Sequence, residues 1–239
     1  MSGKGRSKDA IREAVWDRLE ADGVARFPYP PHGRIPNFEG AAEAAERAMQ
    51  CAVLADARRV KVNPDAPQRP LRRLLLEAGV VLLMPTPRLR AGFLELDPGR
   101  IPAKERGRAA SLSHAKRYAR KVPLRRLPAL DAVVTGSVAV TRDGRRCGKG
   151  HGYSDLEYAI LRELGHDAPP VLTTVHEAQV VDAIPRDPTD LPLSLVVTPE
   201  RTIRVRRPPP APDGIDWERL SEEDLEAMPV LAELRRERS

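Results

Sequence analysis

The sequence predicts an α/β protein with three layers, in which helices cover both faces of a mostly parallel sheet. Short segments rich in β-branched residues alternate with helical segments along most of the 239 residues. This alternation is typical of parallel strands that are joined by crossover helices. Hydrophobic residues make up 41% of the chain, which is enough to fill the core of such a fold. We therefore expect a Rossmann-like α/β/α arrangement.

The first helix is predicted over residues 7–20. Its apolar side chains recur at intervals of four, as one buried face of a helix requires. Ser7 suits the N-cap position, where its hydroxyl can accept a backbone hydrogen bond. After an irregular, proline-rich crossing, an alanine-rich second helix is predicted over residues 40–57.

The rest of the domain repeats this pattern of strand and helix. Strands are predicted from apolar or β-branched segments at residues 59–62, 80–84, 93–96, 131–136, 171–175, 195–198 and 202–205. Helices are predicted between them over residues 69–78, 103–121 and 153–164. The strand over 80–84 is apolar throughout, which indicates burial on both faces. The strand over 93–96 is expected to be partly exposed.

The composition changes after residue 205. The segment 206–210 reads Arg-Arg-Pro-Pro-Pro, which is typical of a linker, and strongly charged sequence follows it. We therefore expect an α/β domain over residues 1–205 and a linker with a charged, partly helical tail over residues 206–239. One helix is predicted in the tail, whose apolar residues suit docking on this domain or on a partner.

Charge and cysteine content limit the class of protein. The net charge is +6, with acidic and basic residues interleaved, which fits a phosphate-rich partner or a general preference for arginine. The two cysteines, Cys51 and Cys147, provide neither a disulfide framework nor a tetrahedral metal site. No apolar segment approaches the roughly 20 residues that cross a bilayer, and the first residues lack a secretory signal. A cytoplasmic protein without membrane contact is predicted.

Residues 143–155 carry the clearest chemical pattern. Their glycines stand at alternate positions, and they expose backbone N–H groups without obstruction by a Cβ atom: Gly148, Gly150 and Gly152. The segment lies between a predicted strand and a helix N-terminus, where free amides and the helix dipole favour anions. Arg145, Arg146 and Lys149 add positive charge. The pattern predicts a phosphate-binding loop, although its spacing is not that of a Walker loop; the alternative is a hairpin turn.

This loop resembles the signature of the 5-formyltetrahydrofolate cyclo-ligases, also called methenyltetrahydrofolate synthetases. The matching residues are Arg146, Gly148, Lys149, Gly150, Gly152, Tyr153 and Asp155. Lys8 and Arg12 match a second element, a Lys and an Arg that share one face of the family's first helix. The resemblance covers roughly residues 7–205.

The resemblance implies an enzyme that uses ATP and Mg²⁺ to convert 5-formyltetrahydrofolate into 5,10-methenyltetrahydrofolate, with release of ADP and phosphate. It implies that the nucleotide is bound by Lys8, Arg12, Arg146, Gly148, Lys149, Gly150, His151, Gly152 and Tyr153. Asp155 would hold Mg²⁺, although a carboxylate in a first helical turn also stabilises the helix itself. Lys149 and Tyr153 are the candidate catalytic residues.

Several residues depart from the family pattern. His151 stands where active members have a lysine, and Ser154 replaces the second aromatic residue of a Tyr-Tyr pair. The alignment places Ser194 at the family's second metal-binding aspartate, and Asp190 takes that place only if the register shifts. The glutamate that contacts folate has no clear counterpart; the residues in its vicinity are Asn63 and Asp65.

A second interpretation is a binding protein that keeps the nucleotide site without the chemistry. One version of it is an RNA-associated protein, which the net charge, the basic residues 116–126 and the Arg-Pro linker favour. Two observations argue against RNA binding. The aromatic content is only 4%, which leaves few side chains for base stacking, and the sequence contains no recognised RNA-binding module.

Overall fold

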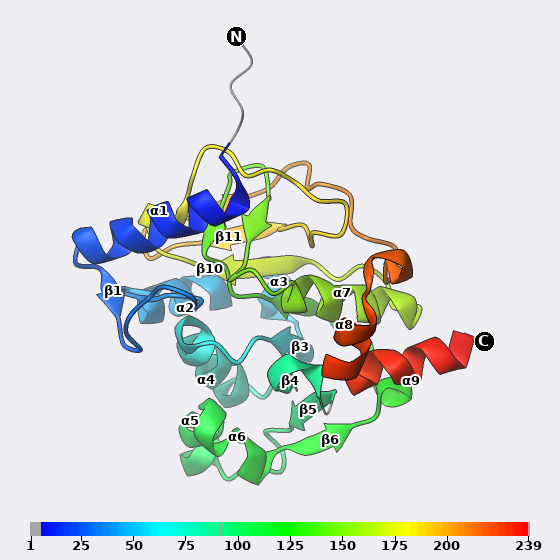
Figure 1. Cartoon of the computed structure of the whole chain (residues 1–239). Helices are drawn as coiled ribbons and strands as arrows, with labels where there is room; N and C mark the ends of the chain where they lie inside the picture. Colours follow the sequence, from blue (N-terminus) through cyan, green and yellow to red (C-terminus); the bar gives the residue numbers. More distant parts are fainter. Residues whose placement is uncertain (1–5, 91, 239) are drawn as a thin grey trace.

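An eight-stranded sheet forms the centre of the computed structural model, which describes residues 6–90 and 92–238 (Figure 1). Predictions that fall on residues 1–5, 91 and 239 lie outside these ranges. The strands of the sheet are β3 (Arg59–Val62), β4 (Val81–Pro85), β5 (Phe93–Leu96), β6 (Arg120–Val122), β7 (Ala132–Val134), β10 (Val171–Thr174), β11 (Leu195–Val197) and β12 (Thr202–Arg204). The pairings of β3, β4, β7, β10 and β11 are parallel, whereas β5, β6 and β12 pair antiparallel.

The chain reverses its winding direction at the middle of this sheet. The spatial order is β12-β11-β10-β7-β3-β4-β5-β6. From β3 the chain proceeds to β4 on one side, and from β7 it proceeds through β10 to β11 on the other. In open α/β sheets, such a reversal leaves a crevice at the carboxyl ends of the strands, and ligands bind there. The fold therefore places its crevice beyond β3 and β7.

Helices cover both faces of the sheet. One face carries α2 (Ala41–Met49), α3 (Ala52–Ala55), α4 (Arg69–Glu77), α5 (Arg106–Ala109) and α6 (Leu112–Tyr118). The other face carries α7 (Tyr153–Glu163), α8 (Glu222–Ala227) and α9 (Pro229–Arg238). Alternate residues of β7 enter the two hydrophobic cores, with Val133 on the α7 side and Ala132 and Val134 on the α4 side. The three-layer prediction is confirmed.

The N-terminal helix α1 (Lys8–Ala21) packs beside two small hairpins. These hairpins are β1 (Ala25–Arg26) with β2 (Asn37–Phe38), and β8 (Ala139–Val140) with β9 (Arg146–Cys147). Ile11 and Leu19 are buried against Val138 and Cys147, as the predicted apolar face requires. The hydroxyl of Ser7 accepts the N–H of Ala10 at 3.2 Å, which confirms the predicted N-cap.

Two predicted helices are wrong in their extent. The helix over 40–57 is divided into α2 and α3, because Cys51 is extended and begins the second helix. The helix over 103–121 is divided into η3, α5 and α6, and it ends where Ala119 becomes extended and β6 begins. Arg120 then pairs with Glu95 of β5 at 2.6 Å. β5 is more buried than predicted, because β6 pairs with its edge and Phe93 enters the hydrophobic core; only Leu94 is partly exposed.

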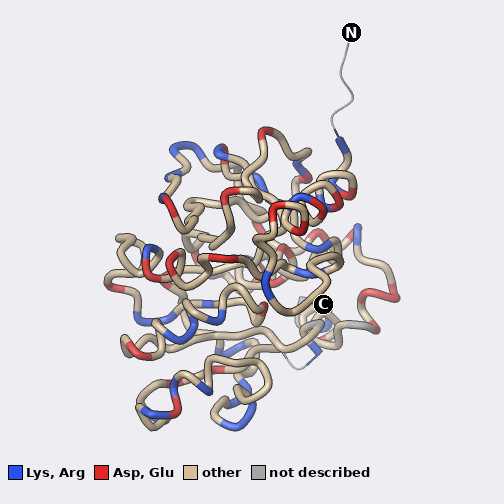
Figure 2. Tube along the Cα trace, turned by 90° about the vertical axis from the view of Figure 1, so that its left-hand side faces the viewer, with Lys and Arg blue, Asp and Glu red and all other residues tan. Residues whose placement is uncertain are grey.

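Short 3-10 helices complete the fold: η1 (Ala66–Gln68), η2 (Pro87–Leu89), η3 (Ala103–Glu105), η4 (Leu124–Arg126), η5 (Glu177–Gln179) and η6 (Trp217–Arg219). Figure 2 shows basic and acidic residues interspersed along the trace, as the sequence suggested. No helix formed by the described residues has the length and apolarity needed to cross a bilayer.

The tail packs on the α7 face of the sheet, where α8 and α9 lie beside α7 (Figure 1). It has two short helices where one was predicted. Its buried residues belong to the same hydrophobic core as Ile160 of α7; they are Ile215, Leu225, Met228, Val230, Leu231 and Leu234. The tail thus docks on this domain, while the division at residue 205 stays a prediction.

A buried arginine joins α4 to the carboxyl end of β3. The Nη1 of Arg72 donates to the carbonyls of Asn63 at 2.6 Å and Asp65 at 2.9 Å, and its Nε donates to the carbonyl of Ala110 at 2.8 Å. Burial lowers the pKa of Arg72 to about 10, so the guanidinium stays charged at neutral pH. Arg72 thereby fixes the chain just after β3, at the crevice.

We expect Arg72→Met to lower the free energy of unfolding by about 2–4 kcal/mol, since three buried carbonyls lose their donor. The matched control is Arg73→Met, one residue along the same helix, where the guanidinium is more than half exposed. This control should change stability by less than about 0.5 kcal/mol. Urea denaturation followed by circular dichroism measures both, and equal effects would contradict the role of Arg72.

Candidate functional site

A cavity of about 450 Å³ lies at the carboxyl ends of β3 and β4, beside the N-terminus of α7. Its volume is within the range of small-molecule sites. The cavity is lined by every residue that the resemblance assigned to nucleotide or metal: Lys8, Arg12, Arg146, Gly148, Lys149, Gly150, His151, Gly152, Tyr153 and Asp155. The structure brings these residues together, and their individual roles stay predictions.

The glycine-rich loop connects β9 to α7 and offers free backbone donors. Gly150 has a φ of 107° and Gly152 a φ of 66°, a region that favours glycine. Gly152 is the N-cap of α7, so the first N–H groups of the helix follow directly. The N–H groups of Gly148, Gly150 and Gly152 donate no hydrogen bond to any of the described residues. Free amides at a helix N-terminus form a site for an anion.

Helix α1 contributes two cations from one face. The Nζ of Lys8 contacts both carboxylate oxygens of Asp190 at 2.6 Å. One turn later, the Nε of Arg12 donates to the carbonyl of Gly148 at 2.6 Å, and its guanidinium pairs with Asp9. Lys8 therefore connects α1 to the segment before β11, whereas Arg12 holds the glycine loop itself.

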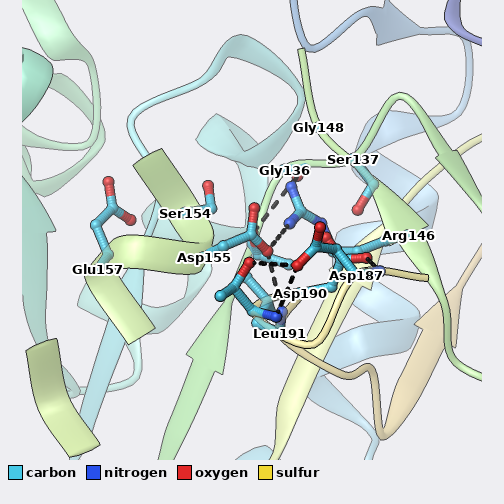
Figure 3. Close-up of polar contacts among 12 residues, drawn as sticks. Gly136, Ser137, Arg146, Gly148, Ser154, Asp155, Glu157, Asp187, Asp190 and Leu191 are labelled. Atoms are coloured by element: carbon cyan, nitrogen blue, oxygen red, sulfur yellow. Dashed lines mark hydrogen bonds and ion pairs between the residues drawn. The ribbon is translucent and has the colours of Figure 1, made fainter. Parts of the chain in front are cut away.

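Arg146 is buried and holds Asp155 in place (Figure 3). Its Nη1 donates to Asp155 Oδ1 at 2.8 Å, and its Nη2 donates to the carbonyl of Gly136 at 3.0 Å. The same Oδ1 accepts the N–H of Leu191 at 3.0 Å. These contacts join β9, the loop after β7 and the start of α7, so Arg146 has a structural connection that the sequence did not indicate.

Lys149 and His151 extend from the loop into the cavity. The Nζ of Lys149 lies 3.6 Å from Asp65, and 39% of its side chain is exposed. This ion pair is longer than the one between Lys8 and Asp190, so Lys149 can turn toward an incoming anion at lower cost. His151 stacks on Tyr153 with ring centroids 5.7 Å apart and an angle of 7° between the planes. The two rings form an offset stack beside the loop.

The position of the second carboxylate requires a correction. Ser194 does not line the cavity; its hydroxyl accepts the N–H of Val171 at 3.3 Å, at the beginning of β10. Asp190 lines the cavity instead, and it accepts the N–H of Asp187 at 2.7 Å (Figure 3). The carboxyl ends of the strands are at the opposite edge of the sheet from Val171, so the fold places Asp190, and not Ser194, at the cavity. A metal-binding role for Asp190 stays a prediction.

The carboxylates that line the cavity are the candidate ligands of a Mg²⁺ ion. Within residues 6–90 and 92–238, no cluster of three or more His, Cys, Asp or Glu residues is arranged for a metal ion. Mg²⁺ at phosphate-binding sites, however, needs only one or two carboxylates, because phosphates and waters complete its shell. Asp155 Oδ2 makes no hydrogen bond to another described residue and lies next to the glycine loop. Asp155 therefore fits a Mg²⁺ ion that is bound together with a phosphate.

A buried ion pair below the cavity was missed from the sequence. Lys61 of β3 pairs with Glu157 of α7, and their side chains are 1% and 5% exposed. The Nζ of Lys61 also donates to Asn63 Oδ1 at 2.6 Å, and Asn63 Nδ2 donates to Ser154 Oγ at 2.9 Å. Burial raises the pKa of Glu157, and the charge of Lys61 opposes that rise. Two departures from the family pattern, Asn63 and Ser154, thus belong to one hydrogen-bonded network.

A signal for this pair was present in the sequence. Lys61 stands between Val60 and Val62 in a strand predicted for the centre of the sheet, and a buried lysine needs a carboxylate partner. The partner could not be read from the sequence, because Glu157 lies 96 positions later. Asp187 could not be identified for the same reason, since it lines the cavity from an irregular segment, whereas Asp190 was already the alternative to Ser194.

The fold and the cavity together define an α/β protein with a glycine-rich loop of free amides at the switch point of a doubly wound sheet. The model of the 5-formyltetrahydrofolate cyclo-ligase family matches residues 4–199. The chain belongs to the 5-formyltetrahydrofolate cyclo-ligase family.

Three known proteins illustrate the relationship. A methenyltetrahydrofolate synthase domain-containing protein of Mus musculus is 45% identical over 97% of this chain, which spans 64% of that protein's length. A 5-formyltetrahydrofolate cyclo-ligase of Mycolicibacterium smegmatis is 32% identical over 54% of this chain and 65% of its own length. The NMR structure of Aquifex aeolicus 5,10-methenyltetrahydrofolate synthetase has a TM-score of 0.53 and 17% identity, and the likeness covers 83% of this chain and 93% of that chain. This last likeness concerns the fold alone.

We expect Lys61→Met to lower the free energy of unfolding by about 3–5 kcal/mol, because it leaves Glu157 buried without its partner. In the double variant Lys61→Met/Glu157→Leu, much of that loss should be recovered, since neither charge is then buried. Arg18→Met breaks an exposed pair with Asp22 and serves as the control, with an effect below about 0.5 kcal/mol. Urea denaturation gives the coupling energy, and additive effects of the two substitutions would refute the pairing.

Proposed function

We propose that this chain is an ATP- and Mg²⁺-dependent cyclo-ligase that converts 5-formyltetrahydrofolate into 5,10-methenyltetrahydrofolate in cytoplasmic one-carbon metabolism. The observation that carries the proposal is the convergence of free loop amides, Lys149 and the α1 cation Lys8 on one cavity, in a chain of this family. That combination suits a triphosphate, because amides and ammonium groups bind phosphate oxygens.

In the proposed reaction, the formyl oxygen attacks the γ-phosphorus of ATP and ADP leaves. The folate N10 then attacks the activated carbon, phosphate leaves with the former formyl oxygen, and N10 loses its proton. Such chemistry depends on positioning and on charge stabilisation more than on a covalent protein nucleophile. The loop amides and Lys149 would orient the γ-phosphoryl group, and Tyr153 faces the same cavity, where it would contact the reacting groups.

Charge balance assigns the remaining roles. Lys8 would exchange part of its contact with Asp190 for a phosphate, and Arg146 would hold Asp155 in the orientation that a metal ion needs. Mg²⁺, bound by Asp155 together with the phosphates, would neutralise charge that develops on the transferred group. His151 would donate a hydrogen bond to the phosphates from the position of the family's lysine.

The alternative is a nucleotide- or RNA-associated binding protein without turnover. The observation in its favour is that the cations Lys8, Arg146 and Lys149 are already paired with carboxylates. The basic residues that supported RNA binding are divided among α6, β6 and η4, and Arg120 is paired with Glu95. They therefore form no continuous basic helix, which weakens the RNA version.

Turnover tests the proposal directly. Purified protein with Mg-ATP and 5-formyltetrahydrofolate should form methenyltetrahydrofolate, followed by its absorbance. Lys149→Ala should lower kcat/KM by about 100-fold or more, because a cation that contacts the transferred phosphoryl group is lost. Lys121→Ala is the matched control, since Lys121 is exposed on β6 and does not line the cavity; its kcat/KM should be unchanged.

Two outcomes would count against the proposal. If ATP binds but no product forms, the result favours a nucleotide-binding protein without turnover. If product forms equally well with Lys149→Ala, the glycine loop is not the site of phosphoryl transfer.

We expect His151→Lys to lower the KM for ATP by about three- to tenfold, since an ammonium group replaces a neutral imidazole beside the loop. His166→Lys adds the same charge at a position outside the cavity, and it should leave the KM unchanged. Steady-state kinetics at saturating folate measure both variants. An equal gain in the two variants would mean that general electrostatics, and not the loop position, sets the KM.

A further inference from the structure

The C-terminal tail forms one wall of the cavity. The tail residues that line it are Gly214, Ile215, Asp216, Arg219, Leu220, Asp224 and Met228. The family model ends at residue 199, so this wall lies beyond the residues that the model matches. The wall is therefore a feature of the site that the family model does not describe.

Specific contacts hold the wall along α7. At one end, the two carboxylate oxygens of Glu163 accept the N–H of Ile215 at 3.0 Å and the indole N–H of Trp217 at 3.2 Å. Further along the tail, Arg219 donates to Asp187 at 2.6 Å. Met228 is buried in the core on the same face of the sheet. Because these contacts hold the wall in place, it is part of a preformed site.

The cavity has two chemically different parts. One part is the glycine loop with its free amides and the nearby cations. The other part is apolar and follows α7 away from that loop; its lining residues are Pro87, Leu156, Ala159, Ile215, Leu220 and Met228. Ala159, Ile215 and Met228 belong to one hydrophobic core, against which Leu156 and Leu220 pack. Such a cavity suits a molecule with an anionic part and an apolar part.

We propose that the apolar tail residues that line the cavity, Ile215, Leu220 and Met228, bind the planar aromatic ring system of the ligand whose anionic part or reacting group lies at the glycine loop. The proposal rests on the proposed function, because both of its substrates, ATP and 5-formyltetrahydrofolate, carry a planar heteroaromatic ring and anionic groups. The shared chemistry is the flat ring, which excludes water from the apolar surface of Leu220, Ile215 and Met228. The experiment distinguishes the adenine ring from the pterin ring.

The test compares Leu220→Ala with Leu225→Ala. Leu220 lines the cavity and is partly buried, whereas Leu225 is buried in the same core and does not line the cavity. Isothermal titration calorimetry measures the Kd of ATP, of 5-formyltetrahydrofolate and of inorganic tripolyphosphate, which has no ring. We expect Leu220→Ala to weaken one ring-bearing ligand by about five- to tenfold, because it removes apolar contact area. The affinity for tripolyphosphate should be unchanged, and Leu225→Ala should lower the Tm without changing any Kd.

The ligand that loses affinity identifies the ring that the tail contacts. Unchanged affinities in Leu220→Ala would overturn the inference, as would an equal loss for tripolyphosphate or in Leu225→Ala. Failure of both ring-bearing ligands to bind the unaltered protein would overturn it as well. Hydrogen exchange on the unaltered full chain gives an independent measurement, in which a ring-bearing ligand, but not tripolyphosphate, should protect the amides of residues 214–228.

The two proposals fail in different ways. Loss of ring binding in Leu220→Ala without any turnover by the unaltered protein would sustain the tail inference and overturn the proposed enzyme. A second pattern would sustain the enzyme and overturn the inference. The unaltered protein would turn over, Leu220→Ala would leave the KM for ATP and the KM for 5-formyltetrahydrofolate unchanged, and neither ligand would protect the amides of residues 214–228.

Discussion

The site depends on how the chain leaves the middle of its sheet. β3 and β7 are neighbours, but the chain winds away from them in opposite directions, which leaves a crevice at their carboxyl ends. Arg72 fixes the segment after β3 through the carbonyls of Asn63 and Asp65, and Arg146 fixes the segment after β7 through Gly136. Both arginines are buried, so the crevice is held by charged groups that water cannot easily replace.

The charges around the cavity are balanced in pairs. Lys8 faces Asp190, Arg146 faces Asp155, and Lys149 lies near Asp65 at the longest of these distances. Balanced pairs keep a cation-rich pocket stable in the absence of an anion, because each charge has a partner. An incoming phosphate competes with these carboxylates, which makes a divalent cation a suitable companion of the nucleotide. Lys149, as the most exposed of these cations, is the one that reorients at lowest cost.

The departures from the family pattern gain a physical explanation when they are seen together. Ser154 and Asn63 are hydrogen-bonded to each other, and Asn63 is hydrogen-bonded to Lys61, whose partner Glu157 is in the same helix as Ser154. A polar network thus occupies the place of an aromatic side chain. The tail supplies apolar surface on another side of the cavity, through residues such as Leu220. The site combines the family loop with a wall that comes from residues beyond the family model.

The sequence by itself determined the layered α/β class, most strands, the capped first helix and the glycine loop, because periodicity, Ser7 and the glycine spacing are local properties. The sequence could not place the break between two helices at Cys51 or the change from helix to strand before Arg120. Packing in the hydrophobic core and the pairing of β6 with β5 determine where these elements end. Only the tertiary structure selected Asp190 over Ser194, paired Lys61 with Glu157 and set the tail against the cavity. These are contacts between residues far apart in sequence, and burial and charge pairing in three dimensions fix them where local spacing cannot.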